Sequence, residues 1–338
     1  MKAGAWAAGE RPVRVVIVGA GGWGQQHARV YASRPDVDLR AVAARHQDRA
    51  DARAAEWGIR AYTSVPAMID AESPDLVSVC LPNEAHFDAT MQVIEAGVPL
   101  LAEKPLAFDL GEADQMLAAA ADRNLFFAIN FNHRYAEPVR RARAAISGGA
   151  LGDIAFAAWR FGGEPGPSRN PYANLIETQC HGLDMLEHLC GPVDSAMAQM
   201  TTRDGLGHPT VAVSLAFASG AVGTLLGSYE TSYAYPGTHL LEVNGTDGRL
   251  LIEDTVKRFT LSRAGEETRQ VWEAGYFNDD GRDFHRTFDH YVDALLAALK
   301  AGAPPPVHAR AGRRALELSR AIIDSFESGQ RVRVAGPR

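Results

Sequence analysis

The sequence predicts an α/β protein with two domains, the first built on a parallel sheet and the second on an open, mostly antiparallel sheet. The chain of 338 residues is longer than a single domain with one compact core usually is, which favours two domains. Up to about residue 130, short apolar runs alternate with helix-compatible segments, a pattern typical of a parallel sheet. Beyond residue 150, β-like runs follow one another without intervening helices and are joined by turn signals.

The first domain is placed at residues 11–134, and about six strands are expected in it. The expected strands cover residues 13–18, 39–43, 61–62, 76–80, 99–102 and 125–130. The expected helices between them cover residues 22–33, 47–57, 65–70, 84–96 and 110–123. Such alternation predicts that every strand runs in the same direction.

The second domain is placed at residues 135–338 and is expected to begin with a helix over 138–147. Its expected strands cover residues 153–162, 193–202, 210–218, 221–232, 238–244, 249–253, 256–263 and 268–272. Apolar residues then recur at helical spacing over 284–299 and 310–327, which predicts two closing helices. The last helix is a candidate to pack back on the first domain.

The composition is that of a globular protein, with 46% hydrophobic and 22% charged residues. A net charge of -7 without a basic stripe argues against a nucleic-acid partner. There is neither a membrane-length apolar run nor the apolar core of a secretory signal, so no membrane association and a cytoplasmic location are expected. Three cysteines without C-x-x-C spacing, Cys80, Cys180 and Cys190, are expected to be reduced thiols.

A glycine-rich segment follows the first expected strand and opens the first expected helix. Residues 19–24 read G-A-G-G-W-G, which matches the pattern G-x-G-x-x-G. Glycines permit the tight turn and let the backbone approach a pyrophosphate, which binds the free N–H groups of the helix N-terminus. A structural glycine turn is the alternative, but the β-α-β setting favours a Rossmann dinucleotide-binding domain. The expected cofactor contacts are Gly19, Gly21, Gly22, Trp23 and Gly24.

The end of the second expected strand bears on the choice between NAD and NADP. An acidic residue that would bind the adenosine ribose is absent there, and the sequence instead reads Ala43, Ala44, Arg45, His46. A small neutral residue followed by arginine leaves room for a 2′-phosphate and supplies a guanidinium to hold it. This favours NADP over NAD, with Arg45 and His46 as contacts, unless Arg45 is merely a solvated charge.

Two later strand ends should also lie near the nicotinamide, because ligands bind at the carboxyl ends of parallel strands. A lysine at such a position can hydrogen-bond a reacting oxygen, although a lysine before proline by itself indicates only a turn. The expected contacts at these two strand ends are Leu81, Pro82, Asn83, His86, Glu103 and Lys104.

A third group of polar residues falls in the segment 177–189. If this segment is one helix, Glu177, His181, Asp184 and His188 form a single polar stripe. His181 is the natural acid/base, since an imidazole titrates near neutrality and can take a hydroxyl proton as hydride leaves the adjacent carbon. The alternatives are a solvated surface helix and a metal site of Glu177, His181 and His188. No H-E-x-x-H motif supports a metal, and none is expected.

The glycine motif, the Glu103-Lys104-Pro105 segment and the His181 segment, in this order, resemble the Gfo/Idh/MocA family of oxidoreductases. The resemblance extends from Val13 to Val334. Supporting matches are residues 81–83 with His86, residues 95–97, residues 130–134, and residues 181–184 leading to residues 189–193. The resemblance implies a Rossmann domain followed by an α/β domain with an open, mostly antiparallel sheet. It also implies NAD or NADP as cofactor and sugars, inositols or related carbonyl compounds as substrates.

Family roles carry over to matching positions of this chain. The resemblance implies that Lys104 contacts substrate and nicotinamide and that His181 is the acid/base. Glu177 stands where the family commonly has aspartate, a departure that keeps the carboxylate but lengthens its reach. The open sheet of the family often forms a subunit interface, which implies a homodimer or homotetramer.

The motifs predict hydride transfer to or from a nicotinamide, and the resemblance implies a sugar, sugar derivative or cyclic polyol as the other reactant. Lys104 is expected to stabilise the developing oxyanion, while Glu177 and Asp184 position the imidazole of His181 or the substrate hydroxyls. The alternatives are a glycoside hydrolase that uses transient oxidation and a non-catalytic dinucleotide-dependent regulator. The expected substrate contacts are Lys104, Asn132, Arg169, Tyr172, Glu177 and His181. Arg169 and Tyr172 lie in an expected loop, and the alternative for them is that they are ordinary polar loop residues.

Overall fold

The computed structural model describes residues 11–81, 85–166 and 168–336, which fall into two compact units. The first unit comprises the described residues up to Asn130 together with Phe288–Arg313. The second unit comprises Phe131–Thr287 and the described residues from Arg314 onward. Each unit contains one sheet with helices.

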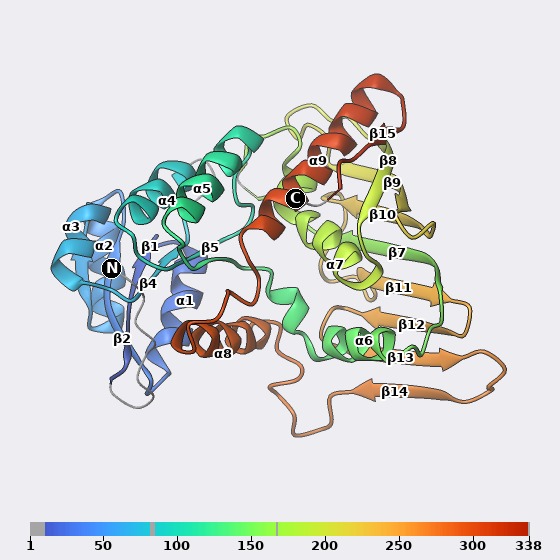
Figure 1. Cartoon of the computed structure of the whole chain (residues 1–338), viewed down its shortest axis with the longest axis horizontal. Coiled ribbons are helices and arrows are strands. Elements are labelled where there is room, and N and C mark those ends of the chain that lie inside the picture. Colours follow the sequence, from blue (N-terminus) through green and yellow to red (C-terminus); the bar gives the residue numbers. More distant parts are fainter. Residues whose placement is uncertain (1–10, 82–84, 167, 337–338) are drawn as a thin grey trace. The chain divides into compact units, whose positions relative to one another are not determined.

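Among the described residues, the first unit contains a six-stranded parallel sheet in the order β3-β2-β1-β4-β5-β6 (Figure 1). The strands are β1 (Val13–Val18), β2 (Val37–Ala43), β3 (Arg60–Tyr62), β4 (Leu76–Val79), β5 (Leu100–Ala102) and β6 (Phe127–Ile129). The strand order reverses at β1, which pairs with β2 on one side and with β4 on the other. Open α/β sheets bind ligands at such a reversal. The predicted parallel-sheet domain is confirmed.

Helices connect these strands, and two begin where the sequence provides a capping side chain. The helices are α1 (Gly22–Ala32), α2 (Gln47–Trp57), α3 (Val65–Glu72), α4 (His86–Glu95) and α5 (Leu110–Asp122). Ser64 caps α3 by accepting a hydrogen bond from the Ala67 N–H, and Asp109 caps α5 in the same way. Such caps satisfy N–H groups that have no partner inside the helix.

Helix α8 (Arg286–Lys300) lies beside α1, as Figure 1 shows, although the two are far apart in the sequence. Its Phe288 ring packs against the ring of His27 with centroids 4.3 Å apart. Its Tyr291 hydroxyl donates to the carbonyl of Ile129 at 2.7 Å. Phe288 and Tyr291 are fully buried, so this segment contributes to the core of the first unit.

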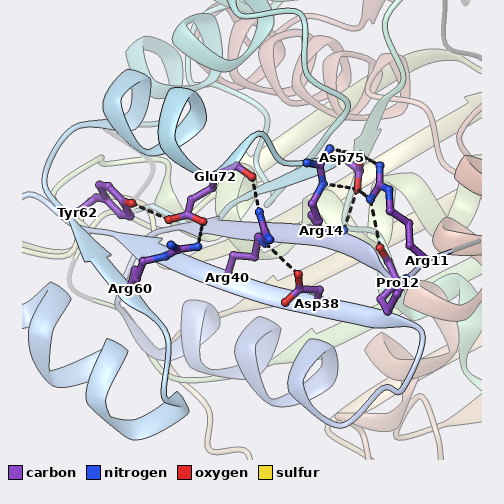
Figure 2. A network of polar contacts seen from close by, with 9 residues as sticks. All are labelled: Arg11, Pro12, Arg14, Asp38, Arg40, Arg60, Tyr62, Glu72 and Asp75. Carbon is purple, nitrogen blue, oxygen red and sulfur yellow. Dashed lines mark hydrogen bonds and ion pairs between the residues drawn. The ribbon is translucent and has the colours of Figure 1, made fainter.

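One half-buried carboxylate, Asp75, ties the start of β1 to the segment before β4 (Figure 2). Arg11 and Arg14 both donate to it, at 2.6 and 3.0 Å. The Arg14 backbone N–H donates at 2.9 Å. Burial opposes the ionisation of Asp75, but these donors outweigh it and lower its pKa to about 2.

A second carboxylate in Figure 2, Glu72 at the end of α3, is fully buried. The Tyr62 hydroxyl donates to it at 2.6 Å, and Arg60 forms an ion pair with it. Arg40 donates to the Glu72 backbone carbonyl at 2.9 Å. The contacts join α3 to β2 and β3, and they compensate the cost of burying the charge.

In the described part of the chain, the second unit has a nine-stranded sheet in the order β14-β13-β12-β11-β7-β10-β9-β8-β15. The strands are β7 (Ile154–Gly162), β8 (Val193–Met200), β9 (Thr210–Phe217), β10 (Val222–Ser228), β11 (His239–Gly245), β12 (Gly248–Glu253), β13 (Arg258–Arg263), β14 (Arg269–Glu273) and β15 (Val332–Arg333). Neighbours are antiparallel except β7 and β10. The predicted mostly antiparallel sheet is confirmed; β15 is too short for the sequence pattern to indicate.

Helices α6 (Glu137–Ser147) and α7 (Cys180–Cys190) pack on this sheet, α6 against β12 and β13 and α7 against β7 (Figure 1). The remaining helical elements are η2 (Asn132–Tyr135), the π-helix η3 (Asn174–Thr178) and α9 (Arg310–Ser328). Burial alternates along β9 and β10, so one face of these strands is core and the other is exposed. The exposed face includes large apolar side chains, namely Phe156, Met197, Val222 and Leu226.

The cysteines Cys80, Cys180 and Cys190 are buried free thiols, as expected. None of the helices in the described ranges combines the length and the apolar character that crossing a bilayer requires.

Candidate cofactor and catalytic sites

The turn after β1 requires glycine at two positions. Gly19 has a φ of 126°, and a Cβ there would lie 2.5 Å from the carbonyl oxygen of Cys80. A Cβ at Gly24 would lie 2.0 Å from the carbonyl oxygen of Gly19. The turn and the first turn of α1 therefore pack too closely for any side chain.

The other two glycines of the turn face open space. A Cβ at Gly21 or Gly22 would have no atom within 4 Å, and both residues are exposed. Helix α1 has neither an acidic residue in its first turn nor a side-chain cap. Its first N–H groups can thus bind a pyrophosphate, and the turn fits a dinucleotide.

A cavity of about 650 Å³ lies beside this turn, wholly within the first unit. Its lining includes Gly19, Gly21, Arg45 and His46, and also Leu81 at the end of β4. The cavity thus brings the glycine turn together with the predicted residues at the end of β2. Pro82 and Asn83, also predicted as cofactor contacts, lie outside the described residues.

Arg49 lines the same cavity, but it was not predicted from the sequence as a cofactor contact. It lies on α2, four residues beyond Arg45, which precedes the helix, and both side chains are exposed. A second arginine so soon after Arg45 is the signal that could have found it. Ala43 and Ala44 complete this part of the lining, and they are buried and uncharged.

His86 connects the ends of β4 and β5. The ring is buried, with Nε2 2.6 Å from the Leu81 carbonyl and Nδ1 3.1 Å from the Pro105 carbonyl. Burial lowers the pKa of His86, although both carbonyls favour the protonated ring. These contacts assign His86 a part in fixing the two loops.

Glu103, at the end of β5, points into the interior. His27 Nε2 lies 2.8 Å from Oε1, Asn130 donates to the same oxygen at 2.6 Å, and the Lys104 N–H approaches Oε2 at 3.3 Å. Burial opposes the ionisation of Glu103, but His27 and Asn130 outweigh it and lower its pKa. The carboxylate thus anchors the backbone of Lys104, whose side chain is half-buried. Sequence reasoning missed His27 and assigned no role to Asn130.

In the second unit, His181 lies in the first turn of α7 and is 7% exposed. Its ring stacks on His133 of η2, with centroids 4.0 Å apart and planes 10° apart. Gly182 lets the helix approach β7, since a Cβ there would lie 2.4 Å from Trp159 Nε1. His181 is therefore held between η2 and the sheet.

The predicted single helix over residues 177–189 is wrong, because Glu177 belongs to the π-helix η3 and α7 begins at Cys180. Trp159 donates to the Gln179 side chain at 3.0 Å, and Gln179 donates to the Asn174 side chain at 3.0 Å. The Gln179 N–H also bonds the Asn174 carbonyl at 2.9 Å, the five-residue spacing of a π-helix. The predicted stripe is thus interrupted after Glu177, which is half-buried. A solvated surface helix is excluded, because residues 180–186 are all buried.

Asp184 is buried beside Arg134. Arg134 donates to it twice, Nε to Oδ2 at 2.8 Å and Nη2 to Oδ1 at 2.5 Å. Burial raises the pKa of Asp184, and Arg134 opposes this shift. The ion pair joins α7 to η2. Asn132, also in η2, is buried and donates to Thr287 at 2.7 Å.

The loop before η3 contains two predicted substrate contacts. Arg169 is exposed. The Tyr172 ring stacks on His208 at 4.8 Å, and its hydroxyl donates to Glu327 at 2.7 Å. No group of three or more His, Cys, Asp or Glu side chains that could hold a metal ion was found among the described residues.

The chain is similar to known proteins along nearly its whole length. Residues 13–131 match the family model for the NAD-binding Rossmann fold of the Gfo/Idh/MocA oxidoreductases, and residues 143–334 match that for the C-terminal α/β domain. Inositol 2-dehydrogenase of Rhizobium meliloti is 25% identical over 96% of this chain and 99% of its own. D-glucoside 3-dehydrogenase of Escherichia coli is 37% identical over 42% of this chain and 41% of its own.

The fold is also shared with a crystal structure of an NAD-binding oxidoreductase from Klebsiella pneumoniae. That structure superposes with a TM-score of 0.87 at 22% identity, covering 96% of this chain and 99% of the other. The two family matches together cover nearly the whole chain. The chain therefore belongs to the Gfo/Idh/MocA family of NAD-binding oxidoreductases.

Proposed function

We propose that this oxidoreductase interconverts an alcohol and a carbonyl group on a sugar, a sugar derivative or a cyclic polyol. The glycine turn with open space at Gly21 and Gly22, beside a cavity of about 650 Å³, carries the proposal, because it fits the dinucleotide that such a reaction needs. The names of the relatives that act on inositol and on D-glucosides support the substrate class.

A bound nicotinamide accepts or supplies the hydride in this chemistry. His181 takes the hydroxyl proton during oxidation and returns it during reduction, and Lys104 stabilises the negative charge that develops on the oxygen. Glu103 fixes the backbone position of Lys104 by accepting a hydrogen bond from its N–H. Glu177 and Asp184 are proposed to position His181 or the substrate, and Asp184 acts through its ion pair with Arg134.

We propose NADP as the preferred cofactor. Arg45, His46 and Arg49 surround the part of the cavity next to the end of β2, and Ala43 and Ala44 provide no carboxylate there. Two guanidinium groups without a competing acid suit a 2′-phosphate better than a 2′-hydroxyl.

We also propose that the enzyme is a homodimer or homotetramer formed through the exposed sheet face. Phe156, Met197, Val222 and Leu226 are each more than two-fifths exposed on this face, and Val222 reaches 57%. Apolar clusters of this kind mark protein interfaces. Light scattering of the purified protein tests this, and a monomer at micromolar concentration contradicts it.

The function is tested by following reduced-nicotinamide absorbance with a panel of sugars, methyl glycosides and inositols, each with NAD and with NADP. His181→Ala should lower kcat by roughly 10² to 10⁴-fold, the usual contribution of a positioned acid/base. His188→Phe is the matched control, a histidine of the same helix with its pKa lowered to about 3 by burial. Unchanged turnover in His181→Ala contradicts the assignment. Cleavage of a glycoside without net nicotinamide reduction would instead indicate the hydrolase alternative.

A further inference from the structure

We propose that His133 is a positioning residue for His181, because the two buried imidazoles are stacked face to face and protonation of one opposes protonation of the other. His133 thereby disfavours the charged form of His181 and orients its ring to accept a hydroxyl proton. This inference rests on the proposed role of His181 as acid/base. It concerns a residue to which neither the sequence motifs nor the family comparison assigned a function.

The geometry of the pair carries the argument. The ring centroids of His133 and His181 are 4.0 Å apart and the ring planes differ by 10°, a face-to-face stack. His133 is 3% exposed and His181 is 7% exposed, so little water reaches either ring. Two cationic rings at this distance repel each other strongly in a poorly solvated setting, and protonation of one opposes protonation of the other.

The surroundings hold the stack in place. The rings of Phe131 and His181 pack edge to face with centroids 5.8 Å apart, and those of Phe284 and His133 do so with centroids 5.2 Å apart. The ion pair of Arg134 and Asp184 joins the two elements that bear the histidines. Neither ring can turn away from the other without disturbing a buried contact.

The charged groups next to the two histidines do not determine which ring is protonated. Arg134 and Asp184 neutralise each other. His239 of β11 lies 5.6 Å from His133, and burial keeps its pKa well below the usual value, so it is uncharged at neutral pH. The other titratable groups on these elements are Glu177 of η3, Tyr135 of η2, Glu242 of β11, and Cys180, Glu187, His188 and Cys190 of α7.

A merely structural role for His133 makes a different prediction. If the ring only filled space, phenylalanine would replace it without changing how His181 titrates. If His133 tunes His181, its loss removes a like charge, and His181 then holds its proton to higher pH. The decisive comparison is therefore His133→Phe, which keeps an aromatic face and removes the titratable group.

The experiment uses the full-length protein saturated with dinucleotide. The pH dependence of kcat/KM for alcohol oxidation is measured for the wild type, His133→Phe and the control His188→Phe. The imidazole resonances of His181 are followed by NMR over the same pH range. In His133→Phe, the acid limb of the profile and the titration of His181 should both move up by roughly one pH unit or more. In His188→Phe, both should stay in place.

Two outcomes would overturn the proposal. One is a folded His133→Phe protein in which His181 titrates at the wild-type pH, and the other is a shift to lower pH. If His133→Phe does not fold, His133→Gln removes the same charge with a polar side chain, and the same readings apply. The NMR titration does not depend on turnover. Active His181→Ala would therefore refute the catalytic role, whereas an unmoved His181 titration would refute the pairing alone.

Discussion

Arg134 holds Asp184 through two hydrogen bonds, at 2.8 and 2.5 Å, with the carboxylate buried and the guanidinium partly exposed. Removing Asp184 leaves the Arg134 charge without its partner and only partly solvated. Asp184→Asn should therefore lower the free energy of unfolding by about 2 kcal/mol, less than the loss of a fully buried pair. Urea denaturation measures this.

The control for that measurement is Glu137→Gln, which breaks pairs with Arg140 at 3.5 Å and with Arg141 at 2.8 Å on a partly exposed side of α6. Exposed pairs of this kind contribute about 0.5 kcal/mol. Equal losses in the two variants would show that burial does not strengthen the contribution of the Asp184 pair.

Gly21→Ala and Gly24→Ala should separate ligand binding from folding. A methyl group at Gly24 would meet the Gly19 carbonyl at 2.0 Å, so this variant should lose about 1–3 kcal/mol of stability. A methyl group at Gly21 meets no protein atom within 4 Å, so stability should change by less than about 1 kcal/mol. The methyl would occupy space that a pyrophosphate needs, and the Kd for dinucleotide should rise by about tenfold, or 1.4 kcal/mol. Calorimetry measures both quantities, and unchanged affinity in Gly21→Ala contradicts this cofactor position.

Arg49→Ala tests the proposed preference for NADP. The residue lines the cavity beside Arg45 and is exposed, so a charge-assisted hydrogen bond from it should contribute about 1.5 kcal/mol. The KM for NADP should rise by about tenfold while the KM for NAD stays the same. Arg123→Ala, an exposed arginine at the end of α5, is the control. An equal effect on both cofactors would remove Arg49 from the 2′-phosphate site.

The sequence predicted most strands and helices because apolar runs alternate with glycine, proline and capping residues. The turn at residues 19–24 could also be predicted, because close contacts within this part of the chain require glycine at particular positions. The π-helix η3 could not be predicted, because it depends on Gln179 reaching both Trp159 and Asn174 across the fold. The stacking of His133 on His181 likewise depends on how η2 and α7 pack, which local pattern does not contain.

The burial of α8 illustrates the same limit. Its apolar residues recur at helical spacing, which predicts that one face is buried. The pattern does not say which core the face joins, and the contacts of Phe288 with His27 and of Tyr291 with Ile129 place it in the first unit. A periodic sequence thus predicts an amphipathic helix, whereas its partner follows from tertiary packing.

Asp75 should make stability depend on pH. Its pKa in the folded protein is about 2, below the value of an unfolded aspartate, so the folded state favours the ionised form. The resulting stability is fully present above the unfolded pKa of about 3.9 and is lost as the pH falls through the folded pKa. Asp75→Asn should cost about 2 kcal/mol at neutral pH. Denaturant unfolding of both proteins checks this, since the difference should shrink below about pH 4. A difference independent of pH would show that the charge of Asp75 is not its source.

Glu103→Gln tests how the interior positions Lys104. Oε1 of Glu103 accepts from Asn130 and pairs with His27, which a glutamine oxygen can still do. Oε2 faces the Lys104 N–H at 3.3 Å, and there the glutamine amide would place a donor against a donor.

The mismatch should cost about 1–3 kcal/mol of stability and displace the backbone of Lys104. Because that lysine is proposed to act only as charge develops on the reacting oxygen, kcat should fall more than KM changes. Glu95→Gln, an exposed glutamate at the end of α4, is the control for the change of charge. Thermal unfolding and steady-state kinetics together show whether Glu103 positions Lys104 or only stabilises the fold. A stability loss with full kcat would mean that Glu103 supports the fold without positioning Lys104.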